Sequence, residues 1–227
     1  MRVLLIDGYE IAAQRVTALL HREEICVDVA DCAEEGLDLA RHFDYDIIIT
    51  ELQLRDFKGV DMIRRLRAAA KSMPVMVLTA SNEVEDKVAA FGAGADDYMT
   101  KPFNGAELAS RVRALVRRSR GFSHPMLNIG KVAIDLAART ASVDGHPIEL
   151  TNMEFRILEL LSLRRGTAMT NETVISQLYF EGDGPNSKTI AVMMCKLRKK
   201  LALATGGDRV IETVPQRGYL LRRDRAA

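Results

Sequence analysis

The chain has 227 residues, too many for one small module and enough for two domains of about a hundred residues each. It is 48% hydrophobic and 28% charged, a composition that is typical of globular proteins and excludes a disordered or collagen-like chain. No apolar run approaches the roughly 18 residues of a membrane span, so we expect no membrane partner. Three Cys and four scattered His argue against a disulfide framework or a structural zinc site and favour a cytoplasmic protein.

The charge is divided unevenly along the chain. Residues 1–120 hold 17 Lys and Arg against 20 Asp and Glu, a net charge of −3. Residues 121–227 hold 15 against 11, a net charge of +4. An acidic half joined to a basic half predicts two tasks, one of which involves a polyanion.

The first half alternates short β-branched runs with amphipathic stretches. Strands are predicted at 3–6, 25–30, 47–50, 75–79 and 97–100, and helices at 9–20, 33–42, 59–70, 83–92 and 104–118. The runs DIIIT and VMVLT are almost wholly apolar, as expected of strands that helices cover on both faces. This alternation predicts a doubly wound α/β domain with a five-stranded parallel sheet over residues 1–118.

A second patterned region follows residues 119–125 (SRGFSHP), which we interpret as a linker because they combine Ser, Gly and Pro. Within residues 126–227, strand-like segments are predicted at 127–135, 138–144 and 146–150. Helical patterns follow at 151–164, 171–180 and 187–203, and strands at 209–214 and 218–222 close the chain. Three helices followed by a β-hairpin predict an α+β winged-helix domain.

Polar residues gather where the predicted parallel strands end, at the edge of the sheet where such folds bind ligands. The set comprises Asp7, Gly8, Glu51, Thr79 and Lys101. Together with GADDYMTKPF at 94–103, this set resembles the CheY-like receiver domain of two-component response regulators over the whole first half. The resemblance implies a cis peptide between Lys101 and Pro102. It also implies that Thr79 and Tyr98 are switch residues.

Two positions depart from the receiver pattern. In that family a phosphoryl group passes to an Asp after the third strand, with Mg²⁺ held by paired carboxylates. This chain has Glu51 at the acceptor position and Gly8 in place of the second acid. Gly8 supplies no ligand, and Glu51 reaches about 1.5 Å further than Asp, closer to Thr79 and Lys101. We therefore expect weak or absent Mg²⁺ binding, no other cofactor or metal, and no ordinary phosphorylation.

Glu51 has three interpretations on the sequence alone. It is a built-in mimic that biases the domain towards its active dimer, or a relic in a pocket that no longer communicates with the rest of the chain. Alternatively, phosphorylation persists at Glu51 or elsewhere, under a histidine kinase phosphorelay. An enzyme is not expected, because phosphatases on such sheets need a second Asp where this chain has Tyr9, and we assign no catalytic residue.

A dimerisation face is predicted on the fifth helix of the first half, whose buried stripe is Leu108, Val112, Leu115 and Val116. OmpR/PhoB-type response regulators, which the chain resembles, dimerise through their fourth helix, fifth strand and fifth helix. Their intersubunit ion pairs map onto Lys87 with Glu107, Asp97 with Arg111, and Asp96 with Arg118. The resemblance implies a homodimer. A solvated charged face is the alternative, because such surface pairs are worth only about 0–1 kcal/mol each.

The most basic helix of the second half, residues 187–202, holds five cations and no acid. Its apolar positions predict that Ile190, Met194, Leu197 and Leu201 face the core. The opposite side carries Lys188, Val192, Lys196 and Lys199, with Ala191 and Cys195 alongside. A basic face with small residues suits the major groove of double-stranded DNA, and a solvated face in a non-binding domain is the alternative. Cys195 is either a redox switch or simply a small residue on a crowded face.

This helix and the following ETVPQRGYLL match the recognition helix and wing of the OmpR/PhoB-type DNA-binding domain. The match implies DNA contacts from Lys188, Thr189, Val192, Lys196, Arg198, Lys199, Thr213 and Arg217. Val192 and Lys196 are the expected base readers, and Arg217 the residue that reaches a narrow minor groove. Thr189 and Thr213 are expected to contact phosphates.

The loop at 179–187 carries Glu181 and Asp183, which are candidate contacts for RNA polymerase, although turn chemistry alone also explains its Gly, Pro and Asn. Within the family, the stretches MRVLLI, VRRS, LELLSLR and CKLRKKL imply targets in cell-cycle, division or flagellar control. The sequence therefore predicts a homodimeric, sequence-specific transcription regulator that acts independently of phosphorylation. A phosphorylation-dependent regulator is the alternative.

Overall fold

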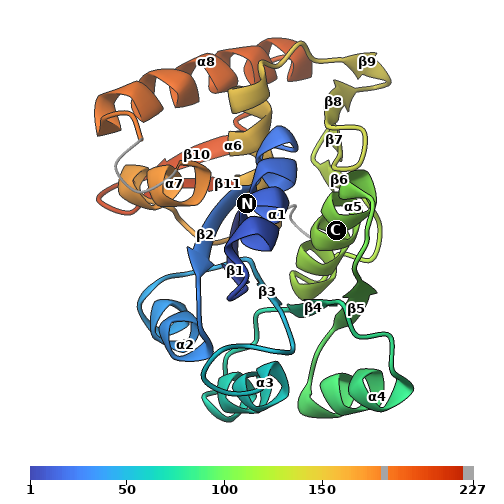
Figure 1. The fold of residues 1–227 in the computed structure, drawn as a ribbon. Helices are drawn as coiled ribbons and strands as arrows, with labels where there is room; N and C mark the ends of the chain where they lie inside the picture. Colours follow the sequence, from blue (N-terminus) through green and yellow to red (C-terminus); the bar gives the residue numbers. More distant parts are fainter. Residues whose placement is uncertain (180–183, 222–227) are drawn as a thin grey trace. The chain divides into compact units, whose positions relative to one another are not determined.

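The computed structural model describes residues 1–179 and 184–221, and the chain divides into two compact units, Met1–Ser119 and Arg120–Ala227 (Figure 1). The predicted linker 119–125 begins one residue earlier than this boundary, because Ser119 is the last residue of a helix. Its hydroxyl donates to the carbonyl of Val116 at 2.9 Å and so completes the last helical turn.

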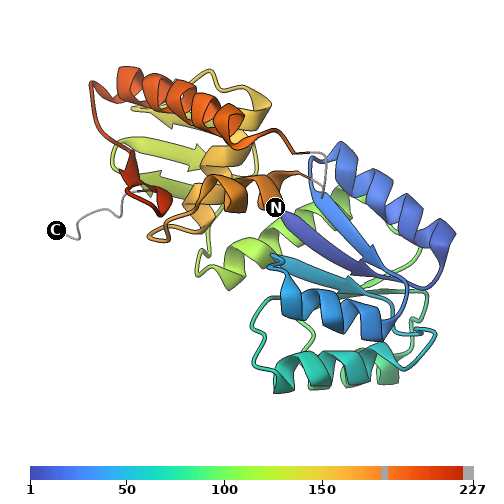
Figure 2. The same cartoon turned by 90° about the vertical axis from the view of Figure 1, so that its left-hand side faces the viewer.

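The first unit is built on a parallel sheet in the order β2-β1-β3-β4-β5. The strands are β1 (Arg2–Ile6), β2 (Cys26–Ala30), β3 (Ile47–Thr50), β4 (Val75–Thr79) and β5 (Asp97–Thr100). The helices are α1 (Glu10–Arg22), α2 (Ala33–His42), α3 (Gly59–Ala68), α4 (Val84–Ala93) and α5 (Gly105–Ser119). Figure 2 shows α1 on one side of the strands and α2 and α3 on the other. The predicted doubly wound fold is confirmed.

The register of the strands brings the predicted pocket residues to one edge. Ile6 pairs with Thr50 and Thr79 pairs with Thr100, so the residues that follow these strands emerge side by side. Backbone bonds extend the pairing past the strand ends, from Glu51 N to Ile6 O at 2.9 Å and from Lys101 N to Thr79 O at 2.7 Å. The peptide between Lys101 and Pro102 is cis, as expected.

The second unit has an antiparallel sheet, three helices and a closing hairpin, and its predicted α+β winged-helix fold is confirmed. The sheet is β6 (Met126–Ile129), β7 (Val132–Asp135), β8 (Thr140–Val143) and β9 (His146–Pro147). The remaining elements are α6 (Asn152–Leu163), α7 (Asn171–Leu178), α8 (Ser187–Thr205), β10 (Ile211–Val214) and β11 (Gly218–Leu221). The predicted segment 127–135 is two strands, because Gly130 (φ +55°) turns the chain so that Ile129 pairs with Val132.

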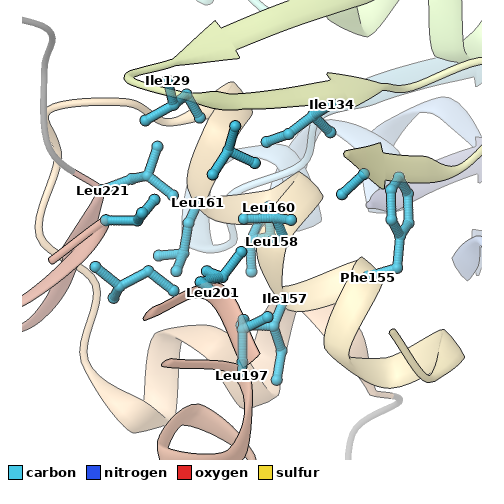
Figure 3. Packing of buried hydrophobic residues seen from close by; sticks show 14 of the residues in the cluster. Ile129, Ile134, Phe155, Ile157, Leu158, Leu160, Leu161, Leu197, Leu201 and Leu221 are labelled. Atoms are coloured by element: carbon cyan, nitrogen blue, oxygen red, sulfur yellow. The ribbon is translucent and has the colours of Figure 1, made fainter. Parts of the chain in front are cut away.

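The core of the second unit forms around α6, which is buried along most of its length. Figure 3 shows its side chains meeting Ile129 and Ile134 of the sheet, Leu197 and Leu201 of α8, and Leu221 of the hairpin. The four residues that were predicted to face inward from α8 are at most 1% exposed. This burial confirms the predicted orientation of α8 and leaves its basic side to solvent.

A capping box at the start of α6 is tied to α8 by an ion pair. Thr151 N donates to Glu154 Oε2 at 2.8 Å, and Lys200 Nζ donates to the same oxygen at 2.7 Å. Burial alone would raise the pKa of Glu154, but the bonds from Lys200 and Thr151 outweigh it and hold the pKa below its usual value. Ionised Glu154 therefore stabilises the fold above pH 4.5, and this contribution is lost as the pH falls through the lowered pKa.

Glu154→Gln should lower the free energy of unfolding by about 1 kcal/mol at pH 7, because Gln preserves the capping bond but loses the charge that faces Lys200. The deficit should shrink as the pH falls from 4.5 through the lowered pKa of Glu154, where the native carboxylate also becomes protonated. Urea unfolding at pH 7 and at acid pH measures both effects, and the exposed Glu149→Gln is the matched control. A deficit that is independent of pH would contradict the ion-pair account.

Candidate functional site

The pocket at the carboxyl edge of the sheet is organised by one lysine. Lys101 Nζ donates to Asp7 Oδ2 at 2.8 Å and to Glu51 Oε2 at 2.9 Å. The side chains of Asp7 and Glu51 are 1% and 5% exposed, so both carboxylates are shielded from water. Burial would lower the pKa of Lys101, but its bonds to the two acids outweigh burial and raise the pKa. The lysine is therefore charged at neutral pH and neutralises one of the two acids.

Glu51 is directed at Lys101. Its second oxygen, Oε1, accepts a hydrogen bond from Leu52 N at 2.7 Å, so both oxygens have partners. Thr79, which is 1% exposed, uses its hydroxyl to accept from Ser81 N at 3.3 Å. The sequence predicted that Glu51 reaches towards Thr79 and Lys101. In the described residues it bonds to Lys101. The ammonium is the charged partner that a desolvated carboxylate requires.

The resemblance to receiver domains implies Mg²⁺ in this pocket, but the residues here do not fit it. Mg²⁺ demands near-octahedral oxygen coordination and is bound mostly through carboxylates. Position 8 offers no carboxylate, and Lys101 holds both remaining acids. This donor set fits an internal ion pair better than a metal.

Ser81 joins the two predicted switch residues, a link that the sequence reading missed. Its amide donates to Thr79, and its carbonyl accepts from the Tyr98 hydroxyl at 3.0 Å. The Ser81 hydroxyl donates to Asp86 of α4 at 2.6 Å. A path of hydrogen bonds therefore runs from the end of β4 to α4 and β5. Tyr98 is half-buried, and burial raises its pKa.

Several predicted dimerisation residues are already paired within one chain. Arg111 contacts Asp97 at 3.1 Å and Glu107 at 2.9 Å. Asp96 accepts from Arg67 at 2.8 Å, an intrachain partner that the sequence did not indicate.

The other two cations of the predicted dimerisation face bond to backbone or polar groups. Lys87 Nζ bonds to Asn82 Oδ1 at 2.6 Å, and Arg118 Nε bonds to the Ala114 carbonyl at 3.4 Å. Lys87 lies on α4, which also carries exposed apolar side chains that the sequence did not indicate. Val84, Val88 and Phe91 are 66%, 65% and 50% exposed. The face thus combines charged residues with uncovered apolar area.

The exposed side of α8 is basic. Lys188, Lys196 and Lys199 are exposed and form no ion pair within residues 1–179 and 184–221, and Val192 between them is 54% exposed. Cys195 is also exposed on this side. The helix begins at the cap Asn186, whose Oδ1 accepts from the amide and the hydroxyl of Thr189. The predicted basic face is therefore assembled as expected, and its DNA contacts remain a prediction.

The wing is the turn between β10 and β11, where Val214 pairs with Gly218. Arg217 is exposed in this turn, and its amide donates to Val214 O at 3.0 Å. Arg198 Nη2 donates to Thr213 Oγ1 at 2.8 Å, and its guanidinium lies 5.1 Å from the Tyr219 ring centroid. These two predicted DNA contacts thus also join the recognition helix to the wing.

The two acids of the predicted polymerase-binding loop, Glu181 and Asp183, lie outside the described residues. No helix within the described ranges is long and apolar enough to cross a membrane.

Comparison with known proteins agrees with both halves of the fold. Residues 3–113 match the response regulator receiver domain, and residues 145–221 match the C-terminal domain of transcriptional regulatory proteins. The chain belongs to the response regulators of the OmpR/PhoB type: it is a two-component regulator with a DNA-binding domain, and its relatives are transcription regulators rather than enzymes.

It is similar to the cell cycle transcriptional regulator CtrA of Caulobacter vibrioides, with 46% identity over 98% of this chain and 96% of the relative. The cell cycle response regulator CtrA of Brucella anthropi is 45% identical over the same shares. The receiver domain of the Francisella response regulator 1452 is 31% identical, with a TM-score of 0.50, over 52% of this chain and 98% of that one.

Proposed function

We propose that this protein is a cytoplasmic, homodimeric regulator that binds specific DNA sites without being phosphorylated. The observation that carries the proposal is the bridge from Lys101 to both Asp7 and Glu51. The Glu51 carboxylate lies at the acceptor position and already forms an ion pair with Lys101. The similarity to CtrA supports targets in cell-cycle or flagellar control.

Phosphorylation independence follows from the chemistry of the pocket. Phosphoryl transfer to a receiver relies on a metal to offset the charge of the incoming group. Here Gly8 supplies no acid for that metal, and both oxygens of Glu51 are engaged. We expect incubation with acetyl phosphate and Mg²⁺ to leave the intact mass of the protein unchanged.

The dimer is proposed to form through the face of α4, β5 and α5. Exposed apolar side chains of α4 supply area to bury, and the neighbouring ion pairs supply specificity. A two-fold pair of receivers would place two recognition helices on two DNA half-sites. The loop with Glu181 and Asp183 remains a candidate contact for RNA polymerase.

Light scattering on the untreated protein, Glu51→Ala and Glu51→Asp tests the role of Glu51. The native chain should be dimeric and Glu51→Ala monomeric, because the substitution removes the built-in negative charge at the acceptor position and leaves Lys101 bonded to Asp7 alone. Glu34→Ala, at an exposed position on α2, is the control and should stay dimeric. Equal masses for all variants would show that the pocket does not govern assembly.

A further inference from the structure

Arg55, in the loop after Glu51, lies across the position where the receiver family has its second acid. Its Nη2 donates to the carbonyl of Gly8 at 2.7 Å, and its Nη1 donates to Asp31 Oδ2 at 2.9 Å. One side chain thus ties the loop between β3 and α3 to the ends of β1 and β2. Nothing in the sequence pattern indicated this contact.

Gly8 is what makes room for Arg55. A Cβ at position 8 would lie 3.0 Å from Asp31 O, 3.1 Å from Arg55 Cγ and 3.2 Å from Arg55 Nε. These separations are tighter than ordinary van der Waals contact, so a side chain at position 8 requires Arg55 and the Asp31 backbone to give way by a few tenths of an ångström. The absence of a side chain at Gly8 and the placement of the Arg55 guanidinium therefore depend on each other.

The loop that carries Arg55 is fixed independently by the next residue. Asp56 accepts hydrogen bonds from Ala33 N at 3.0 Å and Glu34 N at 2.8 Å, at the amino end of α2. These charge-assisted bonds satisfy amides that the helix itself leaves unpaired. Arg55 is consequently presented to Gly8 from a loop with few alternative positions.

Two protein cations lie at this edge: Lys101 bonds to both carboxylates, and Arg55, which is 60% exposed and paired with Asp31, bonds to the Gly8 carbonyl. Glu51, Thr79 and Lys101 also line a cleft of about 690 Å³ on the side away from Arg55, which is not among its lining residues. A divalent ion bound beside Gly8 would meet the positive charges of Lys101 and Arg55, which oppose its binding.

We propose that Arg55 is a positioning residue that closes the metal side of the pocket and, with Lys101, replaces Mg²⁺ by internal cations. The inference deepens the proposed phosphorylation independence and rests on it. It predicts that restoring an acid at position 8 does not restore metal binding while Arg55 remains.

Titration calorimetry with MgCl₂ on the full chain compares Gly8→Asp with Gly8→Asp/Arg55→Ala. The double variant should bind Mg²⁺ on the order of tenfold more tightly, because one like charge near the ion is gone. Arg55→Ala alone should bind weakly, since position 8 still lacks an acid. Equal affinities for the two Gly8→Asp proteins would overturn the proposal.

A second measurement needs no metal and covers the case in which Gly8→Asp fails to fold. Thermal unfolding of Gly8→Ala, Arg55→Ala and the double variant forms a cycle. The added methyl group should destabilise the protein less when Arg55 is absent, and strictly additive effects would refute the coupling. Phosphate uptake by the unaltered protein would contradict the proposed function, which neither of these readouts measures.

Discussion

Replacing Gly218 by alanine should destabilise the second unit by about 3–5 kcal/mol and abolish DNA binding. Gly218 has φ +94°, a conformation that costs an L-residue energy by itself. A Cβ here would also overlap the backbone carbonyl of Met169, whose carbon would lie 2.5 Å away. Backbone atoms cannot rotate aside, so the hairpin must move.

That movement would undo the placement of the wing. Tyr219 and Met169 exchange two backbone hydrogen bonds of 2.8 Å, which hold β11 against the segment before α7. Losing them would free the wing that carries Arg217. It would also break the hydrogen bond between Thr213 of the wing and Arg198 of the recognition helix. Urea unfolding followed by circular dichroism, together with a duplex-binding assay, measures both consequences.

Gly207→Ala is the matched control for this substitution. Gly207 has a similar φ of +108°, but nothing lies within 4 Å of a Cβ built there. Its substitution should cost only the conformational part, about 1–2 kcal/mol, and should preserve DNA binding. If the two variants lost the same stability, the close approach of Gly218 to Met169 would not be a determinant of the fold.

The pocket shows which features a sequence can reveal. Parallel strands in register end at one edge, so the sequence sufficed to bring Asp7, Glu51 and Lys101 together. The role of Arg55 could not be predicted in this way, because it depends on the absence of a side chain at Gly8, 47 residues away in the chain. A loop side chain has no periodicity that reports its partner.

For the recognition helix, the sequence predicted the orientation but not the partners of its cations. The 3.6-residue period correctly separated its buried side from its exposed side. Charge alone did not show that Lys200 is held by Glu154, or that Arg198 also bonds to Thr213. These partners lie 46 and 15 residues away, so only the tertiary structure distinguishes such cations from free ones.

Adjacent lysines of α8 should consequently differ in their effect on DNA binding. Lys199 is exposed without an ion pair in the described chain, whereas Lys200 bonds to Glu154 and to the carbonyl of Glu149 at 2.8 Å. Each phosphate that a protein cation neutralises contributes about −0.9 to the slope of log K against log salt concentration. Lys199→Gln should therefore make the slope less steep by about 0.9.

Lys200→Gln should leave this slope unchanged, although it removes the same charge from the same helix and weakens the cap of α6. Fluorescence anisotropy with a duplex of arbitrary sequence suffices, because non-specific affinity is almost wholly electrostatic. If Lys200→Gln reduced the slope as much as Lys199→Gln, the cations would act through the net charge of the helix, whatever their positions. A difference between neighbours instead requires a docked face, with Lys199 at the phosphates and Lys200 held by Glu154 and Glu149.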